Sequence, residues 1–165
     1  MWGSALMFLR ENAAKGGALN IRRVDLETGE EAWLKEAWGA QGSPVRGDGF
    51  YAFIEDVDGR ERQVVLMSDS ERYVLCGMPG RTQWGAAAHG TDVAWVERLH
   101  GGRQARVVVV RDFDVAEPQC LDGRRARLRS GVLDDGARVH LTNDHVVWIE
   151  RDPVTHLNAL WAWEH

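Results

Sequence analysis

Histidine and carboxylate side chains are the groups of this chain that could bind a metal or move protons. His140, Asp144 and His145 come nearest to a metal-binding group, because imidazole and carboxylate are common metal ligands. These three residues straddle an expected turn between strands, which favours a role as polar turn and strand-edge residues. His89 and His100 have no ligand spacing. The sequence therefore predicts no metal site.

Nucleophile and phosphate-binding motifs are the next chemistry to consider. The sequence has no Gly-x-Ser-x-Gly, no phosphate-cradling glycine loop and no His-Glu-x-x-His. Glu55 with its neighbour Asp56, Glu97 and Glu150 recur at matching positions of similar segments. Such repetition indicates strand ends or ion pairs with nearby arginines rather than a catalytic acid pair. We predict no catalytic residue and no cofactor.

A basic cluster interrupts the otherwise regular pattern at residues 123–136, a stretch expected to be a loop insertion. Its arginines are Arg124, Arg125, Arg127 and Arg129. Such a loop could bind an acidic partner or phosphate, but a solvated loop that offsets an acidic surface is the favoured interpretation. The net charge of −5 argues against binding to nucleic acid or to an anionic membrane.

The cysteines and the N-terminus bear on the cellular compartment. Cys76 and Cys120 could form at most one disulfide, which would need Cα atoms within about 7 Å of each other. Residues 1–10 lack the basic and long apolar regions of a signal peptide, and no stretch reaches the roughly 18 apolar residues of a membrane span. We expect a cytoplasmic protein without membrane contact, or a periplasmic one if a leader was removed.

An internal repeat sets the architecture. Phe8, Phe53, Trp95 and Trp148 sit at the same place in four similar segments, with spacings of 45, 42 and 53 residues. Each segment alternates apolar and polar residues, and a turn, a second strand and a weaker third strand follow it. A further strand precedes each new unit. Four strands in about 42 to 53 residues are typical of a β-propeller blade.

The repeat predicts a single all-β domain over residues 1–165 with fourteen strands, arranged as three, four, four and three. The weak third strand of the third unit is expected near residues 118–123. An antiparallel sandwich or a closed barrel also consists of short strands with regular turns. The repeat length, rather than strand spacing alone, favours blades.

Two segments resemble the repeat of TolB-like propellers. Residues 43–68, SPVRGDGFYAFIEDVDGRERQVVLMS, follow its order of inner-strand turn, Ala-Phe strand, glycine turn and next strand. Residues 20–31, NIRRVDLETGEE, match its corner of aspartate followed by Thr-Gly. Gly47 replaces the serine of the family turn, and the later turns lack proline. The repeat gives about three and a half blades of this kind per chain.

By analogy with propellers, a ligand would bind at the mouth of the central channel. The inner strands and their loops place Arg46, Trp84, Arg138 and His140 there. An exposed Trp84 with an arginine nearby would form a recognition pair. A non-enzymatic interaction module is the predicted function, with a protein partner or ligand at this mouth. A hydrolase or lyase with its site there is the alternative.

Ring closure is the remaining question, because TolB-like propellers generally have six or more blades. A short run of blades leaves two open faces. A second copy could cover them about a two-fold axis, one chain could close a small four-bladed ring, or the chain could be part of a longer propeller. We expect the homodimer, since closed symmetry covers both faces at once. Leu160, Trp161 and Trp163 also make the last strand apolar for a surface.

Overall fold

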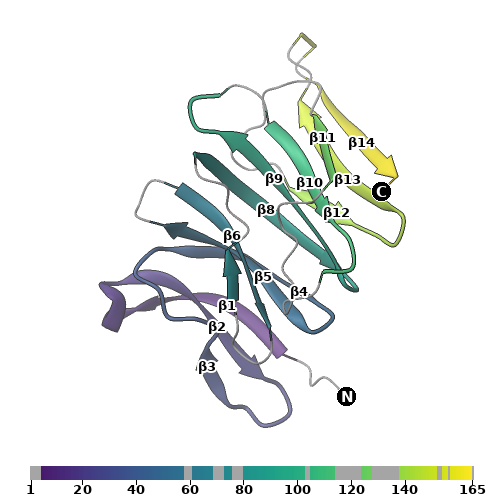
Figure 1. Cartoon of the computed structure of the whole chain (residues 1–165). Coiled ribbons are helices and arrows are strands. Elements are labelled where there is room, and N and C mark those ends of the chain that lie inside the picture. The colour runs from purple at the N-terminus through teal and green to yellow at the C-terminus, as the bar shows by residue number, and fades with distance from the viewer. Residues whose placement is uncertain are drawn as a thin grey trace.

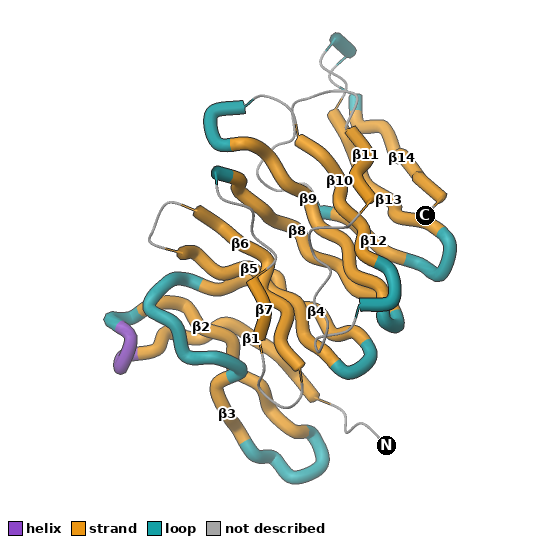
Figure 2. Tube along the Cα trace, viewed as in Figure 1, coloured by secondary structure: helices purple, strands orange, loops and turns teal. Residues whose placement is uncertain are grey.

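The computed structural model is an all-β structure. It describes residues 5–57, 61–68, 73–75, 80–102, 105–113, 124–127, 138–151, 154–155 and 157–164. Figure 2 shows that this part of the chain is almost entirely strand and turn, with one short 3-10 segment at Ala13–Lys15. No helix in these ranges has the length and apolar character needed to cross a membrane. The compartment stays a prediction.

The strands form four antiparallel sheets that follow one another along the chain (Figure 1). Blade 1 contains β1 (Ala5–Asn12), β2 (Ala18–Asp25) and β3 (Glu31–Trp33). Blade 2 contains β4 (Gln41–Gly47), β5 (Phe50–Val57), β6 (Glu61–Ser68) and β7 (Tyr73–Leu75). Blade 3 contains β8 (Arg81–His89), β9 (Asp92–Leu99), β10 (Ala105–Val110) and β11 (Arg124–Arg127). Blade 4 contains β12 (Val139–Leu141), β13 (His145–Arg151) and β14 (Asn158–Glu164).

The predicted strand count is confirmed within the described residues, because the sheets hold three, four, four and three strands. In blades 2 and 3 the first strand is at one edge of the sheet and the fourth is at the other. The first strands β4, β8 and β12 also contact one another in succession, as inner strands around a common axis would. Blade 1 begins at the strand equivalent to β5, and blade 4 stops at the strand equivalent to β6.

The loop insertion expected over residues 123–136 is wrong for four of its residues. Arg124–Arg127 form β11, which pairs with β10 from Arg106↔Arg127 to Val109↔Arg124. This antiparallel backbone ladder joins β11 to the rest of the blade. The outer strand of blade 3 therefore lies at β11 rather than near residues 118–123, and those residues and 128–136 lie outside the described ones.

The four repeat aromatics lie on equivalent strands of the four blades. These are the second strands β5, β9 and β13 of blades 2, 3 and 4, and β1 of blade 1. Phe53 packs toward blade 1 with Ile21, Trp95 packs toward blade 2, and Trp148 packs toward blade 3. All three side chains are buried. Phe8 is partly exposed, because no blade of the described chain precedes it. The equivalence of the aromatic positions is thus confirmed for the three blades that have a preceding neighbour.

The corner that resembles the TolB-like repeat, with Asp25, Thr28 and Gly29, forms a tight turn between β2 and β3. The Asp25 carboxylate accepts hydrogen bonds from the backbone N–H groups of Glu27 and Thr28, each at 2.9 Å. The Gly29 N–H donates to the Asp25 carbonyl at 2.8 Å, and Gly29 has a φ of 75°. Glycine adopts this left-handed conformation without steric cost, so it suits the end of the turn.

Candidate functional site

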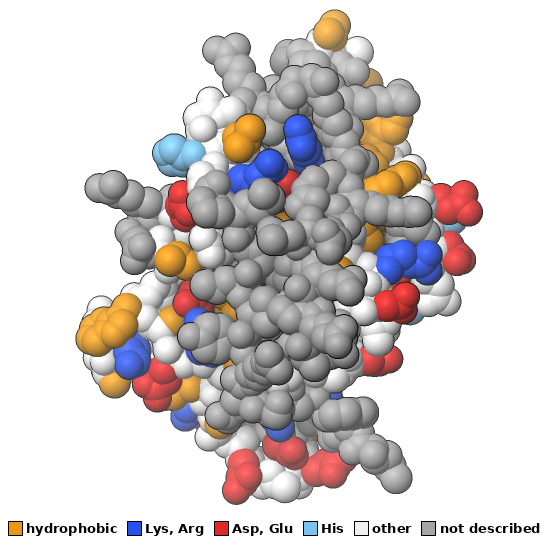
Figure 3. Space-filling view, in the orientation of Figure 1, with side chains coloured by type: hydrophobic (Ala, Val, Ile, Leu, Met, Phe, Trp, Pro, Cys, Tyr) orange, Lys and Arg blue, Asp and Glu red, His pale blue; other side chains and the backbone are white. Residues whose placement is uncertain are grey.

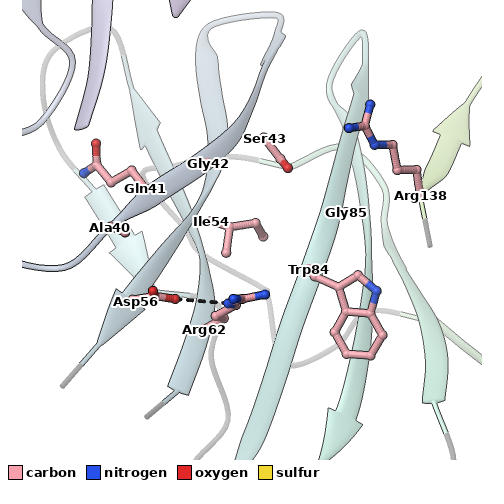
Figure 4. A pocket seen from close by; sticks show the side chains of 10 residues that line it. All are labelled: Ala40, Gln41, Gly42, Ser43, Ile54, Asp56, Arg62, Trp84, Gly85 and Arg138. Atoms are coloured by element: carbon pink, nitrogen blue, oxygen red, sulfur yellow. Dashed lines mark hydrogen bonds and ion pairs between the residues drawn. The ribbon is translucent and has the colours of Figure 1, made fainter. Parts of the chain in front are cut away.

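A pocket of about 250 Å³ lies between the inner strands of blades 2 and 3 (Figure 4). We call it the inner-strand pocket. It is at the end of blade 2 where β4 begins, β5 ends and β6 begins. Its lining comes from three blades: Ala40, Gln41, Gly42, Ser43, Ile54, Asp56, Arg62, Trp84, Gly85 and Arg138. The pocket therefore joins inner-strand backbone to charged side chains from the β5–β6 hairpin and from the start of β12.

Two matching bulges shape the pocket wall. The pairing of β4 with β5 shifts between Gly42 and Val45, and the pairing of β8 with β9 shifts between Trp84 and Ala87. Ser43 and Gly85 occupy the same position inside these bulges, with φ values of 51° and 63°. A positive φ suits glycine but strains a serine. Bulges often aim side chains at sites of function, and here both line the pocket.

The cavity exists because the two repeats carry different side chains at one position. Gly42 on β4 pairs with Ile54, and Trp84 on β8 pairs with Val96, so the glycine and the tryptophan are equivalent. The Trp84 ring packs between blades 3 and 4 with Val139 and other apolar residues of that cluster. Gly42 has no side chain, and a Cβ built on it meets no atom within 4 Å. The space between blades 2 and 3 is thus open at the position where the Trp84 ring fills the space between blades 3 and 4.

Three charged side chains line the inner-strand pocket. The Arg62 Nε donates to the Asp56 carboxylate at 3.2 Å, and the two side chains lie together in Figure 4. Arg138 stands on the other side, at the start of β12. Its side chain is exposed and makes no hydrogen bond or ion pair with the described residues. Two guanidinium groups and one carboxylate leave the lining with a single net positive charge.

Of the four residues expected at the channel mouth, the structure brings Trp84 and Arg138 to one pocket. Arg46 lies toward the other end of β4, with its guanidinium carbon 5.5 Å from the Tyr51 ring centroid. His140 is exposed on β12 and does not line the pocket. The predicted exposure of Trp84 is wrong, because its indole packs among apolar residues and is only 5% exposed.

The other residues considered in the sequence are dispersed. The backbone of Arg124, Arg125 and Arg127 belongs to β11, and Arg129 lies outside the described residues, as do Cys76 and Cys120. His145 begins β13, and its backbone bonds to Thr142 in the turn that follows β12. Across the described ranges, no three His, Cys, Asp or Glu side chains are grouped so that they could hold a metal ion.

Sequence reasoning missed Ser43 and Arg62, and it interpreted Asp56 as a strand-end or ion-pair residue rather than a site residue. Opposite charges on the two sides of the hairpin between β5 and β6 were a usable signal, since Asp56 and Arg62 are register partners. Ser43 could have been found only by aligning the inner strands residue by residue. That alignment needs the position of the bulge, which alternating hydrophobicity does not give.

Comparisons with known proteins bear on the fold. No protein-family model matches this chain, and no curated protein sequence matches it. Its structure is similar to TolB from Acinetobacter baumannii, with a TM-score of 0.68 and 9% identity over 98% of this chain and 39% of that one. The protein assigned as TolB from Agrobacterium tumefaciens gives 0.55 and 13% over 74% of this chain and 44% of that one.

Oligogalacturonate lyase in complex with manganese also gives a TM-score of 0.55, with 15% identity over 86% of this chain and 41% of that one. The chain thus spans less than half the length of each of these three proteins. Identities this low establish the fold and no activity. The chain has the TolB-like β-propeller fold.

Proposed function

We propose that this chain is a non-enzymatic propeller-type binding module, that a second copy completes its ring, and that the ring holds a protein partner or ligand. The exposure of Leu160 on β14 carries the assembly part of this proposal. Leu160 pairs with Ile149, as Val64 pairs with Ile54 and Val107 pairs with Val96. Leu160 is 71% exposed, whereas both valines are 0% exposed.

The opposite end of the blade stack has the same character. Leu6 on β1 is two residues before Phe8, as Tyr51 is before Phe53 and Val93 is before Trp95. Leu6 is 53% exposed, whereas Tyr51 is 2% and Val93 is 0% exposed. Both ends of the stack therefore present side chains at positions that the interior blades bury.

Hydrophobic side chains are visible in Figure 3 along the edge of the molecule where β14 lies in Figure 1. Burying apolar surface is favourable by roughly 25 cal/mol per Å². A second copy that stacks its blade 1 on blade 4 of the first, and its blade 4 on blade 1, would cover both ends by one symmetry operation. The exposed leucines at both ends of the blade stack support the homodimer over a partner that covers only one end.

Mass measurement in solution tests the assembly. Light scattering behind a sizing column at about 50 µM should give twice the chain mass of 18.5 kDa. Leu160→Asp should give the single-chain mass, because it places a charge in the junction. Leu99→Asp is the matched control, since Leu99 is an exposed leucine of the interior blade 3 and should leave the dimer intact. A monomeric wild-type chain would exclude the ring of two copies.

A lyase or hydrolase at the channel mouth is the second candidate, because oligogalacturonate lyase in complex with manganese shares the fold. Cleavage of oligogalacturonate by the purified chain with added manganese would support the enzyme. Absence of turnover, together with retained binding at the inner-strand pocket, would support the non-enzymatic module. This assay is independent of the mass measurement.

A further inference from the structure

The inner-strand pocket has the marks of a built site rather than a packing defect. Apolar clusters pack between blades 2 and 3 and between blades 3 and 4, and the pocket opens where Gly42 stands at the position equivalent to Trp84. Ser43 keeps a left-handed backbone where the matching residue is Gly85. A strained non-glycine residue is retained when the surrounding structure holds it, and such residues cluster at ligand sites.

Polar groups in the pocket remain available to a ligand. Arg62 uses its Nε for Asp56, and the pair leaves the two terminal nitrogens of the guanidinium without a bond to the described residues. In Figure 4 part of the Arg62 guanidinium points away from Asp56 toward β8. Arg138 and the Ser43 hydroxyl also have no partner among the described residues. The pocket thus offers two guanidinium groups and one hydroxyl.

Charge and size narrow the ligand class. The single net positive charge of the lining balances one negative charge, which suits a monoanion better than a dianion such as hydrogen phosphate. Arginine binds planar carboxylates through paired hydrogen bonds. A volume of about 250 Å³ is below the roughly 300–1,000 Å³ of sites for drug-sized molecules. The ligand is therefore small.

We propose that the inner-strand pocket binds a small monocarboxylate of about the size of a sugar acid, held by Arg62 and Arg138 with Ser43 as a hydrogen-bonding neighbour. This inference rests on the proposed binding function and specifies its ligand class. The nearby Asp56 weakens the site for anions and limits its preference to a single charge. Gly42 provides the space.

Titration calorimetry with D-glucuronate, glucose and inorganic phosphate tests this assignment. Glucuronate should bind at least tenfold more tightly than either of the other two, because glucose lacks the charge and phosphate carries more of it. Affinity for glucuronate should fall as salt is raised. Equal binding of glucose and glucuronate would overturn charge recognition. Tighter binding of phosphate, or no binding of glucuronate up to about 10 mM, would overturn the carboxylate assignment.

Variants locate the binding in the pocket. Arg138→Gln and Arg62→Gln should each weaken glucuronate binding at least tenfold, whereas Arg111→Gln should not change it, because Arg111 is an exposed arginine outside the lining. Asp56→Asn should tighten binding severalfold by removing the competing carboxylate. Gly42→Leu should abolish binding by filling the cavity. Unchanged affinity in Arg138→Gln and Gly42→Leu would place the ligand elsewhere.

The outcome can be separated from that of the ring proposal. None of these substitutions lies on the exposed ends of the blade stack, so each variant should keep the mass of the wild-type assembly. A dimer that fails to bind glucuronate would contradict only the ligand assignment. A monomer that binds it would contradict only the ring of two copies.

Discussion

The side chain of Gln83 on β8 accepts a hydrogen bond from the backbone N–H of Val64 on β6, with 2.8 Å between the two atoms. Gln41 on β4 makes the same contact with the N–H of Ile21 on β2, at 3.0 Å. Each glutamine thus joins the inner strand of one blade to the equivalent strand, β2 or β6, of the preceding blade. All four residues are buried. The blades are therefore joined by a repeated polar bond as well as by apolar packing.

Removing this bond should destabilise the fold. Gln83→Leu leaves the buried Val64 N–H unsatisfied, which should lower the free energy of unfolding by about 1–3 kcal/mol. Gln63→Leu on β6 is the control, because Gln63 is only partly buried, and its effect should stay within about 0.5 kcal/mol. Urea unfolding of both variants measures the difference. Equal losses would mean that the bond between blades is not what Gln83 contributes.

The linker between blades 1 and 2 contains a glycine with no room for a side chain. A Cβ on Gly39 would lie 1.8 Å from the Asp56 carbonyl oxygen, which is fixed backbone. Gly39→Ala should therefore lower the free energy of unfolding by about 1–3 kcal/mol or more. Gly42→Ala should be neutral within about 0.5 kcal/mol, since its Cβ meets nothing within 4 Å. Urea midpoints of the two variants measure the difference. If the two midpoints were equal, the close contact at Gly39 would be contradicted.

The blade repeat could be predicted because large buried aromatics mark it. Phe53, Trp95 and Trp148 face preceding blades, and each copy of this position holds a large apolar side chain that packs on the neighbouring blade. β11 was missed because a strand of mostly arginine has no alternation of apolar and polar residues. Its pairing with β10 depends on backbone hydrogen bonds, which leave little trace in sequence.

The candidate site was less predictable than the fold. Trp84 and Arg138 both line the inner-strand pocket because both lie on or beside inner strands, whereas their placement at a channel mouth stays a prediction. The burial of Trp84 was not predicted, since an aromatic on an inner strand can face the channel or a neighbouring blade. The inner-strand pocket results from Gly42 at a position equivalent to Trp84, and this equivalence depends on bulges in both strands. Hydrophobic periodicity does not locate a bulge.

Backbone strain at Ser43 should determine how different substitutions at this position change the free energy of unfolding. A φ of 51° is tolerated by glycine and disfavoured most for β-branched residues. Ser43→Gly should leave the free energy of unfolding unchanged or raise it, while Ser43→Val should lower it by about 1–3 kcal/mol. Thermal and urea unfolding measure this order. If Ser43→Val were the more stable variant, the left-handed conformation would not be the one adopted in solution.

A buried ion pair in blade 3 should be costly to break from one side. Glu97 on β9 is 1% exposed, and the Arg81 guanidinium on β8 donates to its carboxylate. Arg81→Ala should lower the free energy of unfolding by about 3–5 kcal/mol, because it removes the cation beside a buried carboxylate. Adding Glu97→Gln should recover part of that loss. A double variant with the summed loss of the two single variants would show that the charges do not interact.

The Asp25 turn should give a pH dependence of stability. Hydrogen bonds from the Thr28 and Glu27 backbone lower the pKa of Asp25 below its ordinary value of 3.8. The charged carboxylate therefore stabilises the folded chain above that value, and the contribution is lost as pH falls through the lower folded-state pKa. Asp25→Asn keeps a side-chain oxygen acceptor but cannot ionise. Its deficit in unfolding free energy relative to wild type should be constant from about pH 7 to pH 5 and should narrow in stronger acid. Urea unfolding at several pH values measures this deficit. A deficit that widened in acid would contradict the lowered pKa of Asp25.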